Sequence, residues 1–278
     1  MIGQHPELAG LPELKLFAYD TIGELEASLP RYWAVRGFTH RSPGLVRAVA
    51  QLAFGNQSTD GLTCAREWLR QRAHWSGPDV CDFLLARLKP RTGVEKSPEN
   101  VESEDALARL AAAYPRARYL HLTRHPVTTQ RSLEEHLRRT VPEFSVPGQP
   151  MSGMTYWVET NLRILSFTAR RPKHASLRVR AEDVLNDSGT QLRRIAGWLG
   201  IRDDATTLEA MRHPEISPFA RLGIAGSGII GGFDPDFLRN PVPHSVPVPP
   251  AVDRPSGWTE HSALWDTTVD LAVQLGYR

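Results

Sequence analysis

The stretch 117–133, ARYLHLTRHPVTTQRSL, constrains the fold of this chain more than any other. It begins with an apolar alternation at 119–122 that has the length and period of a β-strand. The motif Thr123-Arg124-His125-Pro126 interrupts this run, and residues 127–139 continue at helical spacing. Pro126 suits the first turn of a helix, where its missing N–H would have had no partner. The stretch therefore predicts a strand that passes into a helix through a tight basic turn.

That turn has the chemistry of a phosphate-binding site. A helix N-terminus supplies unpaired N–H groups and a partial positive charge, and Arg124 supplies a planar, permanently charged guanidinium. Ser132 lies about two turns further along the helix and offers a hydroxyl. The alternative is a solvated basic turn that closes the strand–helix unit without binding anything.

The motif Arg-x-Pro, with a serine eight residues after the arginine, resembles the 3′-phosphate-binding segment of a known enzyme family. These are the sulfotransferases that use 3′-phosphoadenosine-5′-phosphosulfate (PAPS). The resemblance implies that Arg124 and Ser132 bind the 3′-phosphate of the nucleotide. The family usually has aspartate after the arginine, where this chain has His125, and this difference leaves both phosphate ligands in place.

A second marker is Lys96-Ser97-Pro98, which follows a predicted short strand at 93–95. It resembles the Lys-Ser/Thr-Pro element of carbohydrate and bacterial sulfotransferases. The resemblance implies that Lys96 points toward the sulfonate and stabilises charge on the bridging oxygen. The alternative is a surface lysine before a helix cap, since Ser97-Pro98-Glu99 also has the pattern of a helix start.

Glu13 is the candidate general base. The segment Glu13-Leu14-Lys15-Leu16-Phe17 resembles a family segment whose glutamate takes the proton of the acceptor, with Lys15 where histidine is common. A carboxylate can serve in this role if burial raises its pKa, or if it removes the proton only as the S–O bond forms. The alternative is an exposed glutamate in a connecting turn.

The family's loop for the 5′-phosphosulfate, of the type Pro-Arg-Ser-Gly-Thr-Thr, has no counterpart in this sequence. In bacterial sulfotransferases a segment similar to residues 5–14 lies directly downstream of that loop and its helix. We therefore expect the chain to lack the family's first strand and phosphate loop. The glycine-rich stretch 226–232 has no basic residue and no following amphipathic helix, so we interpret it as a flexible loop.

The rest of the chain predicts further helices and one more strand. Apolar spacing indicates that 21–90 is mostly helical, with further helices at 105–114, 155–170, 191–200 and 260–276, and a strand at 176–180. Trp33, Trp68 and Trp75 are core residues or, as the less favoured alternative, the lining of an acceptor pocket. Glu182 and Asp183 follow the later strand, and we expect them to cap and orient that corner. A metal site there has no histidine or cysteine to support it.

Composition narrows the class of protein. The chain has 278 residues and a net charge of +2, which is too balanced to favour nucleic acid as a partner. Its two cysteines, Cys64 and Cys81, form neither a disulfide framework nor a metal-binding spacing. No apolar run approaches membrane-span length and the first residues do not resemble a signal peptide, so we expect a cytoplasmic protein.

The resemblance spans nearly the whole chain and implies a single α/β domain over 1–278. We expect the three-layer, P-loop nucleotide-hydrolase-like fold of sulfotransferases, with a parallel sheet and a proline-rich surface segment at 241–256. The implied reaction is metal-free transfer of a sulfonate from PAPS to a hydroxyl or amine of a small-molecule or carbohydrate acceptor. Arg212, Arg221 and Arg239 are open candidates for a further phosphate contact.

Two alternatives remain. The first is a non-catalytic nucleotide-binding protein, and the second, which is less favoured, is a kinase-like transferase on the same fold.

Overall fold

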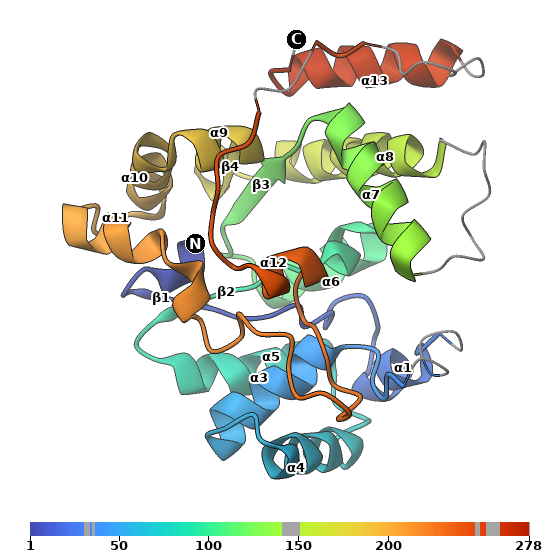
Figure 1. The fold of residues 1–278 in the computed structure, drawn as a ribbon, viewed down its shortest axis with the longest axis vertical. Coiled ribbons are helices and arrows are strands. Elements are labelled where there is room, and N and C mark those ends of the chain that lie inside the picture. The colour runs from blue at the N-terminus through green and yellow to red at the C-terminus, as the bar shows by residue number, and fades with distance from the viewer. Residues whose placement is uncertain (31–33, 35–36, 141–150, 248–250, 254–261, 278) are drawn as a thin grey trace. The chain divides into compact units, whose positions relative to one another are not determined.

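The computed structural model describes residues 1–278 except 31–33, 35–36, 141–150, 248–250, 254–261 and 278 (Figure 1). The chain divides into two compact units, each assembled from two separate segments. The first unit comprises Met1–Ala117 and Leu192–Pro243, and the second comprises Arg118–Gln191 and His244–Arg278. The expectation of a single domain over 1–278 stays a prediction.

In the first unit, strand β1 (Leu8–Gly10) pairs in parallel with β2 (Thr92–Val94). Leu8 lies opposite Thr92 and Gly10 opposite Val94. After β1 the chain passes along residues 11–17, most of which are buried, before the first helix begins. The parallel pairing of strands so far apart requires a long crossover, and the helices between them supply it.

The helices of the first unit before residue 120 lie where the apolar spacing predicts them, and the two after residue 200 lie where no helix was predicted. They are α1 (Ile22–Ala27), α3 (Pro43–Phe54), α4 (Thr59–Arg70), α5 (Gly77–Leu88), α6 (Glu104–Ala113), α11 (Ala205–Met211) and α12 (Pro235–Arg239). Short 3₁₀ turns occur at Ile2–Gln4, Pro98–Val101 and Pro214–Ile216. The predicted helix start at 97–99 is thus a 3₁₀ turn that follows β2.

Serine N-caps set the starts of four of these helices. The side chains of Ser42, Ser58, Ser76 and Ser103 each accept a hydrogen bond from the N–H three residues later, at the starts of α3, α4, α5 and α6. Each such cap is worth about 1 kcal/mol relative to alanine. Helices α4 and α5 pack against α3 (Figure 1). Their apolar faces form the largest core of the chain, together with the buried leucines of residues 11–16.

In the second unit, β3 (Tyr119–Thr123) pairs in parallel with β4 (Ser176–Arg180), so that Thr123 lies opposite Arg180. The unit's helices are α7 (Pro126–Thr140), α8 (Met151–Ala169), α9 (Ala181–Asn186) and α13 (Ser262–Gln274). A 3₁₀ turn at Lys173–Ala175 precedes β4. Helix α10 (Ser188–Leu199) continues from the second unit into the first.

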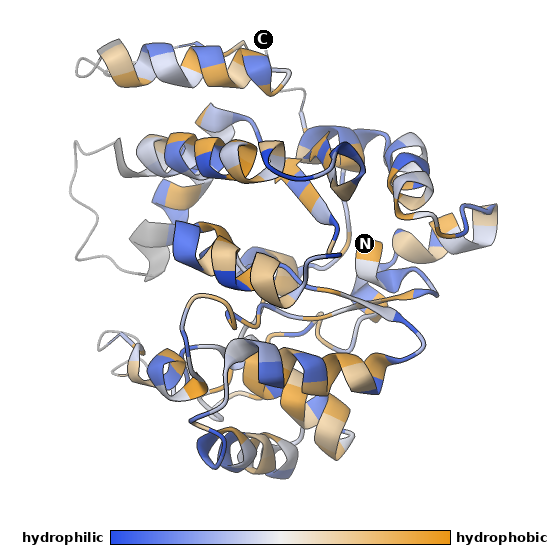
Figure 2. Ribbon diagram, turned by 180° about the vertical axis from the view of Figure 1, so that it is seen from behind, coloured by the Kyte–Doolittle hydropathy of each residue, from blue (hydrophilic) through white to orange (hydrophobic). Residues whose placement is uncertain are grey.

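The core of the second unit is built around α8. Trp157 and Val158 of α8 pack with Leu271, Leu275 and Tyr277 of α13 and the segment after it. Polar and apolar bands alternate along α13, the uppermost helix in Figure 2, as expected for a helix with one buried face. Helix α8 also packs on both β3 and α7, the strand and the helix of the predicted strand–turn–helix segment.

The α/β class and the parallel strands are confirmed, as are the predicted βα unit, the 21–90 helices and the strand at 176–180. The predicted loop at 226–232 is also observed, but it is held at several points. Arg47 is buried and its Nη1 donates to the carbonyl of Gly231 at 2.5 Å. The side chain of Ile229 is fully buried. The loop's glycines adopt positive φ, which turns its carbonyls toward donors of the unit.

None of the helices in the described part of the chain is long and apolar enough to span a membrane. The described residues of the proline-rich segment form neither helix nor strand and are mostly exposed.

Candidate functional site

The turn between β3 and α7 is held through its backbone. The carbonyl of Arg124 accepts a hydrogen bond from Nε1 of Trp157 at 2.9 Å, and the N–H of His125 donates to Oε1 of Glu182 at 2.8 Å. The hydroxyls of Thr128 and Thr129 both donate to the carbonyl of His125, each at 3.0 Å. The backbone geometry of this turn is therefore fixed by residues of α7, α8 and α9.

The side chains of Arg124 and Ser132 are both exposed. Within the described part of the chain, the guanidinium of Arg124 makes no hydrogen bond or ion pair. A permanently charged group left without a protein partner beside a helix N-terminus suits an anionic ligand. Ser132 shares a face of α7 with Thr128, because residues four apart lie on the same side of a helix. The positive charge of Arg124 and the hydroxyl donor of Ser132 are thus the two features of this turn that suit a phosphate.

Neighbouring polar residues of the second unit belong to its core. Nε2 of His121 lies 2.9 Å from Oδ1 of Asn161, and burial lowers the pKa of His121 to about 4. The imidazole is therefore neutral at physiological pH. Asp183 forms an ion pair with Arg180, at 2.7 Å between Oδ2 and Nε. Together with the bond from Glu182 to His125, this agrees with the orienting role expected of Glu182 and Asp183.

In the first unit, Glu13 and Lys96 are brought together. Nζ of Lys96 contacts Oε1 of Glu13 as an ion pair. The two side chains differ in burial, with 15% of the Glu13 side chain and 64% of the Lys96 side chain exposed. An ammonium held mainly by one carboxylate and otherwise in solvent is free to change partner at small cost, since exposed pairs are worth only about 0–1 kcal/mol.

The backbone of Glu13 is fixed on both sides. Its N–H donates to the carbonyl of Gly232 at 2.8 Å, and its carbonyl accepts from the hydroxyl of Ser42 at 2.9 Å. Gly44 comes so close that a Cβ added there would lie 2.3 Å from the carbonyl oxygen of Glu13. Glu13 is therefore not an exposed glutamate in a loose turn.

Glu95 ties the Glu13 segment to the Lys96 segment. Its Oε1 accepts from the N–H of Leu14 at 3.1 Å and from the hydroxyl of Ser97, and its Oε2 accepts from Asn100 at 2.8 Å. Burial raises the pKa of the Glu95 carboxyl above its ordinary value, and the bonds from Ser97 and Leu14 oppose that shift. The carboxylate is thus an enclosed acceptor that serves both segments.

Lys15 occupies a strained position in the same region. Among the described residues other than glycine, Lys15 is the one with a positive φ, at 59°. Its Nζ lies 2.5 Å from Oε1 of Glu99. Its N–H donates to the hydroxyl of Ser97 at 2.9 Å. A left-handed conformation in a residue other than glycine persists only where its surroundings hold it, and these two contacts do so.

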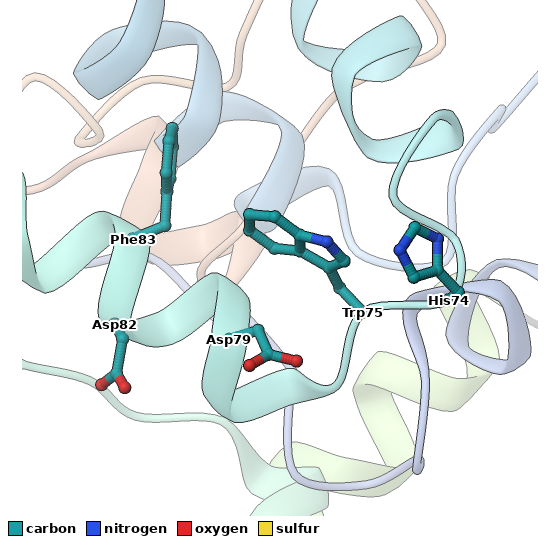
Figure 3. Close-up of a pocket in the computed structure, with 5 residues that line it drawn as sticks. All are labelled: His74, Trp75, Asp79, Asp82 and Phe83. Carbon is teal, nitrogen blue, oxygen red and sulfur yellow. The ribbon is translucent and has the colours of Figure 1, made fainter.

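The aromatic residues considered for an acceptor pocket are mostly structural. Trp68 and Trp75 pack against the core of the first unit, and Trp33 lies outside the described residues. Trp75 also lines an open hollow of about 400 Å³. Figure 3 shows Trp75 with the four other residues that line it. They are His74, Asp79, Asp82 and Phe83.

One oxygen of each carboxylate in that hollow accepts hydrogen bonds from neighbouring residues of the unit. Asp79 accepts from the N–H and hydroxyl of Ser76, and Asp82 accepts from the hydroxyl of Tyr114.

The three C-terminal arginines considered for phosphate differ in their contacts. Arg212, directly after α11, pairs with Glu209 of that helix at 2.9 Å, and Arg239 pairs with Asp236 within α12 at 2.6 Å. Arg221 is exposed. Across the described residues there is no group of three or more His, Cys, Asp or Glu side chains that could hold a metal ion.

Several residues that shape these sites were not singled out in the sequence. Glu95 stands at the carboxyl end of a predicted strand, which is a position where functional side chains gather, and that signal could have identified it. Ser42 and Trp157 have no such signal, because a helix cap and an apolar-face tryptophan are ordinary features. The partners of both lie far away in the chain, at separations of 29 and 33 residues.

A family model described as the sulfotransferase family matches residues 1–205. This match covers well over half of the chain, and the protein therefore belongs to the sulfotransferase family.

Two solved structures share its fold. One is described as the sulfotransferase domain from the curacin biosynthetic pathway, with a TM-score of 0.74 and 19% identity over 100% of this chain and 91% of that chain. The other is described as the sulfotransferase domain from the Synechococcus PCC 7002 olefin synthase, with a TM-score of 0.71 and 23% identity over 100% of this chain and 88% of that chain. No curated protein sequence matches this chain significantly.

Proposed function

We propose that this protein transfers a sulfonate group from PAPS to a hydroxyl or amine of a small-molecule or carbohydrate acceptor. Family membership supports the reaction class. The observation that carries the choice of donor is Arg124, an exposed guanidinium without a partner in the described structure, which follows a parallel strand and precedes a helix. A phosphate would supply the counter-charge that the protein leaves out.

The residues have separate roles in this proposal. When bound, PAPS supplies the sulfonate. Arg124 and Ser132 bind its 3′-phosphate, Glu13 takes the proton of the acceptor, and Lys96 stabilises negative charge on the bridging oxygen.

The ion pair between Glu13 and Lys96 gives this proposal a starting state. The carboxylate of Glu13 and the ammonium of Lys96 neutralise each other in this ion pair. As charge builds on the bridging oxygen, Lys96 turns from Glu13 to that oxygen, and the carboxylate becomes available for the proton of the acceptor. The reaction is an in-line displacement without a covalent enzyme intermediate, and the proposal requires no metal.

A second candidate is a nucleotide-binding protein without transferase activity. Both candidates use Arg124 and Ser132 for the 3′-phosphate. They differ only in whether the bound donor is turned over. The kinase-like alternative gains no support from the family match.

The test of the shared nucleotide site is calorimetric titration with adenosine 3′,5′-bisphosphate. We expect Arg124→Ala to weaken binding about ten- to a hundredfold, because a charge-assisted hydrogen bond is worth about 1.5–3 kcal/mol. Arg170→Ala removes the same charge from an exposed position of the second unit and is the matched control, with an expected change of less than about twofold. Equal affinity of the parent and Arg124→Ala would refute the assignment.

A further inference from the structure

The hydroxyl of Tyr277 lies buried against the turn that carries Arg124. Only 4% of Tyr277 is exposed, and its hydroxyl oxygen is 3.1 Å from Oγ1 of Thr123 and 3.1 Å from Oε2 of Glu182. Its ring meets the imidazole of His125 edge-on, with centroids 5.5 Å apart. The residue thus touches both neighbours of Arg124 in the sequence, from a position 154 residues after Thr123.

The direction of the hydrogen bonds follows from the groups involved. A carboxylate can only accept, so the proton of the Tyr277 hydroxyl goes to Oε2 of Glu182. The other oxygen of Glu182 accepts the N–H of His125 at 2.8 Å. One carboxylate therefore connects the Tyr277 hydroxyl to the backbone N–H that follows Arg124. Burial raises the pKa of Tyr277, so the hydroxyl keeps its proton throughout the physiological range.

The backbone around Tyr277 is itself held by hydrogen bonds to α13 and to the end of β4. Its N–H donates to the carbonyl of Ala272 at 2.9 Å, which closes the end of α13, and the carbonyl of Gly276 accepts from Nη1 of Arg180 at 2.6 Å. Arg180 is the last residue of β4 and also pairs with Asp183. The segment after α13 is thus fastened to the strand that neighbours β3.

The turn is therefore held at three consecutive residues. Thr123 is contacted through its hydroxyl, Arg124 through its carbonyl by Trp157, and His125 through its N–H by Glu182. Among the described residues, the exposed side chain of Arg124 has no hydrogen bond or ion pair to orient it. Its Cα–Cβ direction is consequently set by the backbone on either side.

We propose that Tyr277 is a positioning residue for nucleotide binding, which acts through Glu182 on the backbone of the Arg124 turn. This inference rests on the proposed function, because it deepens the description of the same 3′-phosphate site. The rival interpretation is that Tyr277 only fills the core formed with Trp157 and Leu271. The two differ in the hydroxyl, which a core-filling role does not need.

Tyr277→Phe tests this difference, because it removes only the hydroxyl and keeps the ring. We expect affinity for adenosine 3′,5′-bisphosphate to fall about three- to tenfold in the calorimetric titration, with faster deuterium exchange of the amide of His125 measured by mass spectrometry on a peptide spanning 123–129. Tyr119→Phe is the matched control. Tyr119 lies in the same unit, and its buried hydroxyl has no hydrogen-bond partner among the residues that the structure describes, so neither quantity should change.

Unchanged exchange at His125 in a folded Tyr277→Phe protein overturns the proposal, as does unchanged nucleotide affinity when the parent binds. A lower melting temperature with both quantities unchanged assigns Tyr277 to the core alone.

A parent that does not bind the nucleotide refutes the proposed function, and the exchange measurement then still decides the role of Tyr277. If Tyr277→Phe does not fold, Glu182→Gln replaces it. An amide at this position keeps one oxygen but cannot accept at both, so we expect the same two effects, and their absence overturns the proposal.

Discussion

At the scale of single residues, the proposed catalytic pair Glu13 and Lys96 combines a carboxylate on a fixed backbone with an exposed ammonium. Glu13 is fixed through its backbone by Gly232 and Ser42, while its carboxylate meets Lys96. The proposed transfer requires the Glu13 carboxylate to stay in place, because it receives the proton of the acceptor. It requires the Lys96 ammonium to move, because negative charge develops on the bridging oxygen as the sulfonate is transferred.

Glu13→Gln is predicted to slow sulfonate transfer about 10²- to 10⁴-fold, because an amide cannot take the acceptor's proton. Nucleotide affinity should stay within about twofold, since Arg124 and Ser132 are unchanged. The measurement is transfer of radiolabelled sulfonate from PAPS to a panel of phenols, alcohols and amines, with the exposed Glu104→Gln as the control. An unchanged rate would remove Glu13 from the reaction. Absence of transfer in a parent that binds the nucleotide would favour the non-catalytic candidate.

At the scale of elements, the segment 11–17 depends on the N-termini of two helices. Gly44 in the first turn of α3 approaches the carbonyl of Glu13, and Gly77 at the start of α5 approaches that of Leu16. A Cβ at Gly77 would lie only 1.9 Å from the Leu16 oxygen. Glycine is required at both helix starts because no side chain fits between helix and segment, rather than because of an unusual φ.

Gly44→Ala is predicted to destabilise the protein by about 1–3 kcal/mol, because the new methyl group must push the Glu13 carbonyl away. Transfer should slow while nucleotide affinity stays unchanged.

Gly197→Ala provides the contrast. It lies inside α10 with nothing within 4 Å of an added Cβ, so it should stabilise by about 0.5–1 kcal/mol through helix propensity. Urea unfolding of both variants measures the two effects. Equal stabilities would show that α3 yields to the methyl group.

At the scale of the whole molecule, the two units share one chain that passes between them three times, at 117–118, 191–192 and 243–244. Neither unit is a continuous segment, so neither can be completed until both of its parts are in place. Cys81 lies in the core of the first unit, where burial raises the pKa of its thiol to about 11, whereas Cys64 is exposed. Cys81 is therefore a probe of the opening of the first unit.

In a Cys64→Ser protein, we predict that adenosine 3′,5′-bisphosphate at 100 times its Kd slows disulfide-exchange labelling of Cys81 about a hundredfold. This follows if both units unfold together, because the ligand then stabilises the whole folded state by about 2.7 kcal/mol. Labelling that does not respond to the nucleotide would show that the first unit opens on its own. The thiol signal of unfolded protein in urea provides the reference rate.

How far the sequence predicts a feature of this protein depends on how far apart in the chain the interacting residues lie. The βα unit at 119–139, the serine-capped helices and the strand at 176–180 were all predictable, because hydrophobic period and capping depend on residues a few positions apart. The candidate residues Glu13, Lys96, Arg124 and Ser132 were also identified from local motifs, and their roles stay predictions. The packed state of the 226–232 loop was not predictable, since the donor to Gly231 is 184 residues away in α3.

The sequence by itself determined most of the elements, though not the short helices α11 and α12, and it determined the residue types at the end of β3 and the family resemblance, since each of these depends on short spacing. Only the tertiary structure decided which distant groups form hydrogen bonds to the candidate site residues and their neighbours. Glu95 reaches Leu14 across 81 positions, Glu182 reaches His125 across 57, and Tyr277 reaches Glu182 across 95. A hydrogen bond has no sequence signature when its partners come together only through packing, because the pairing depends on where whole elements lie.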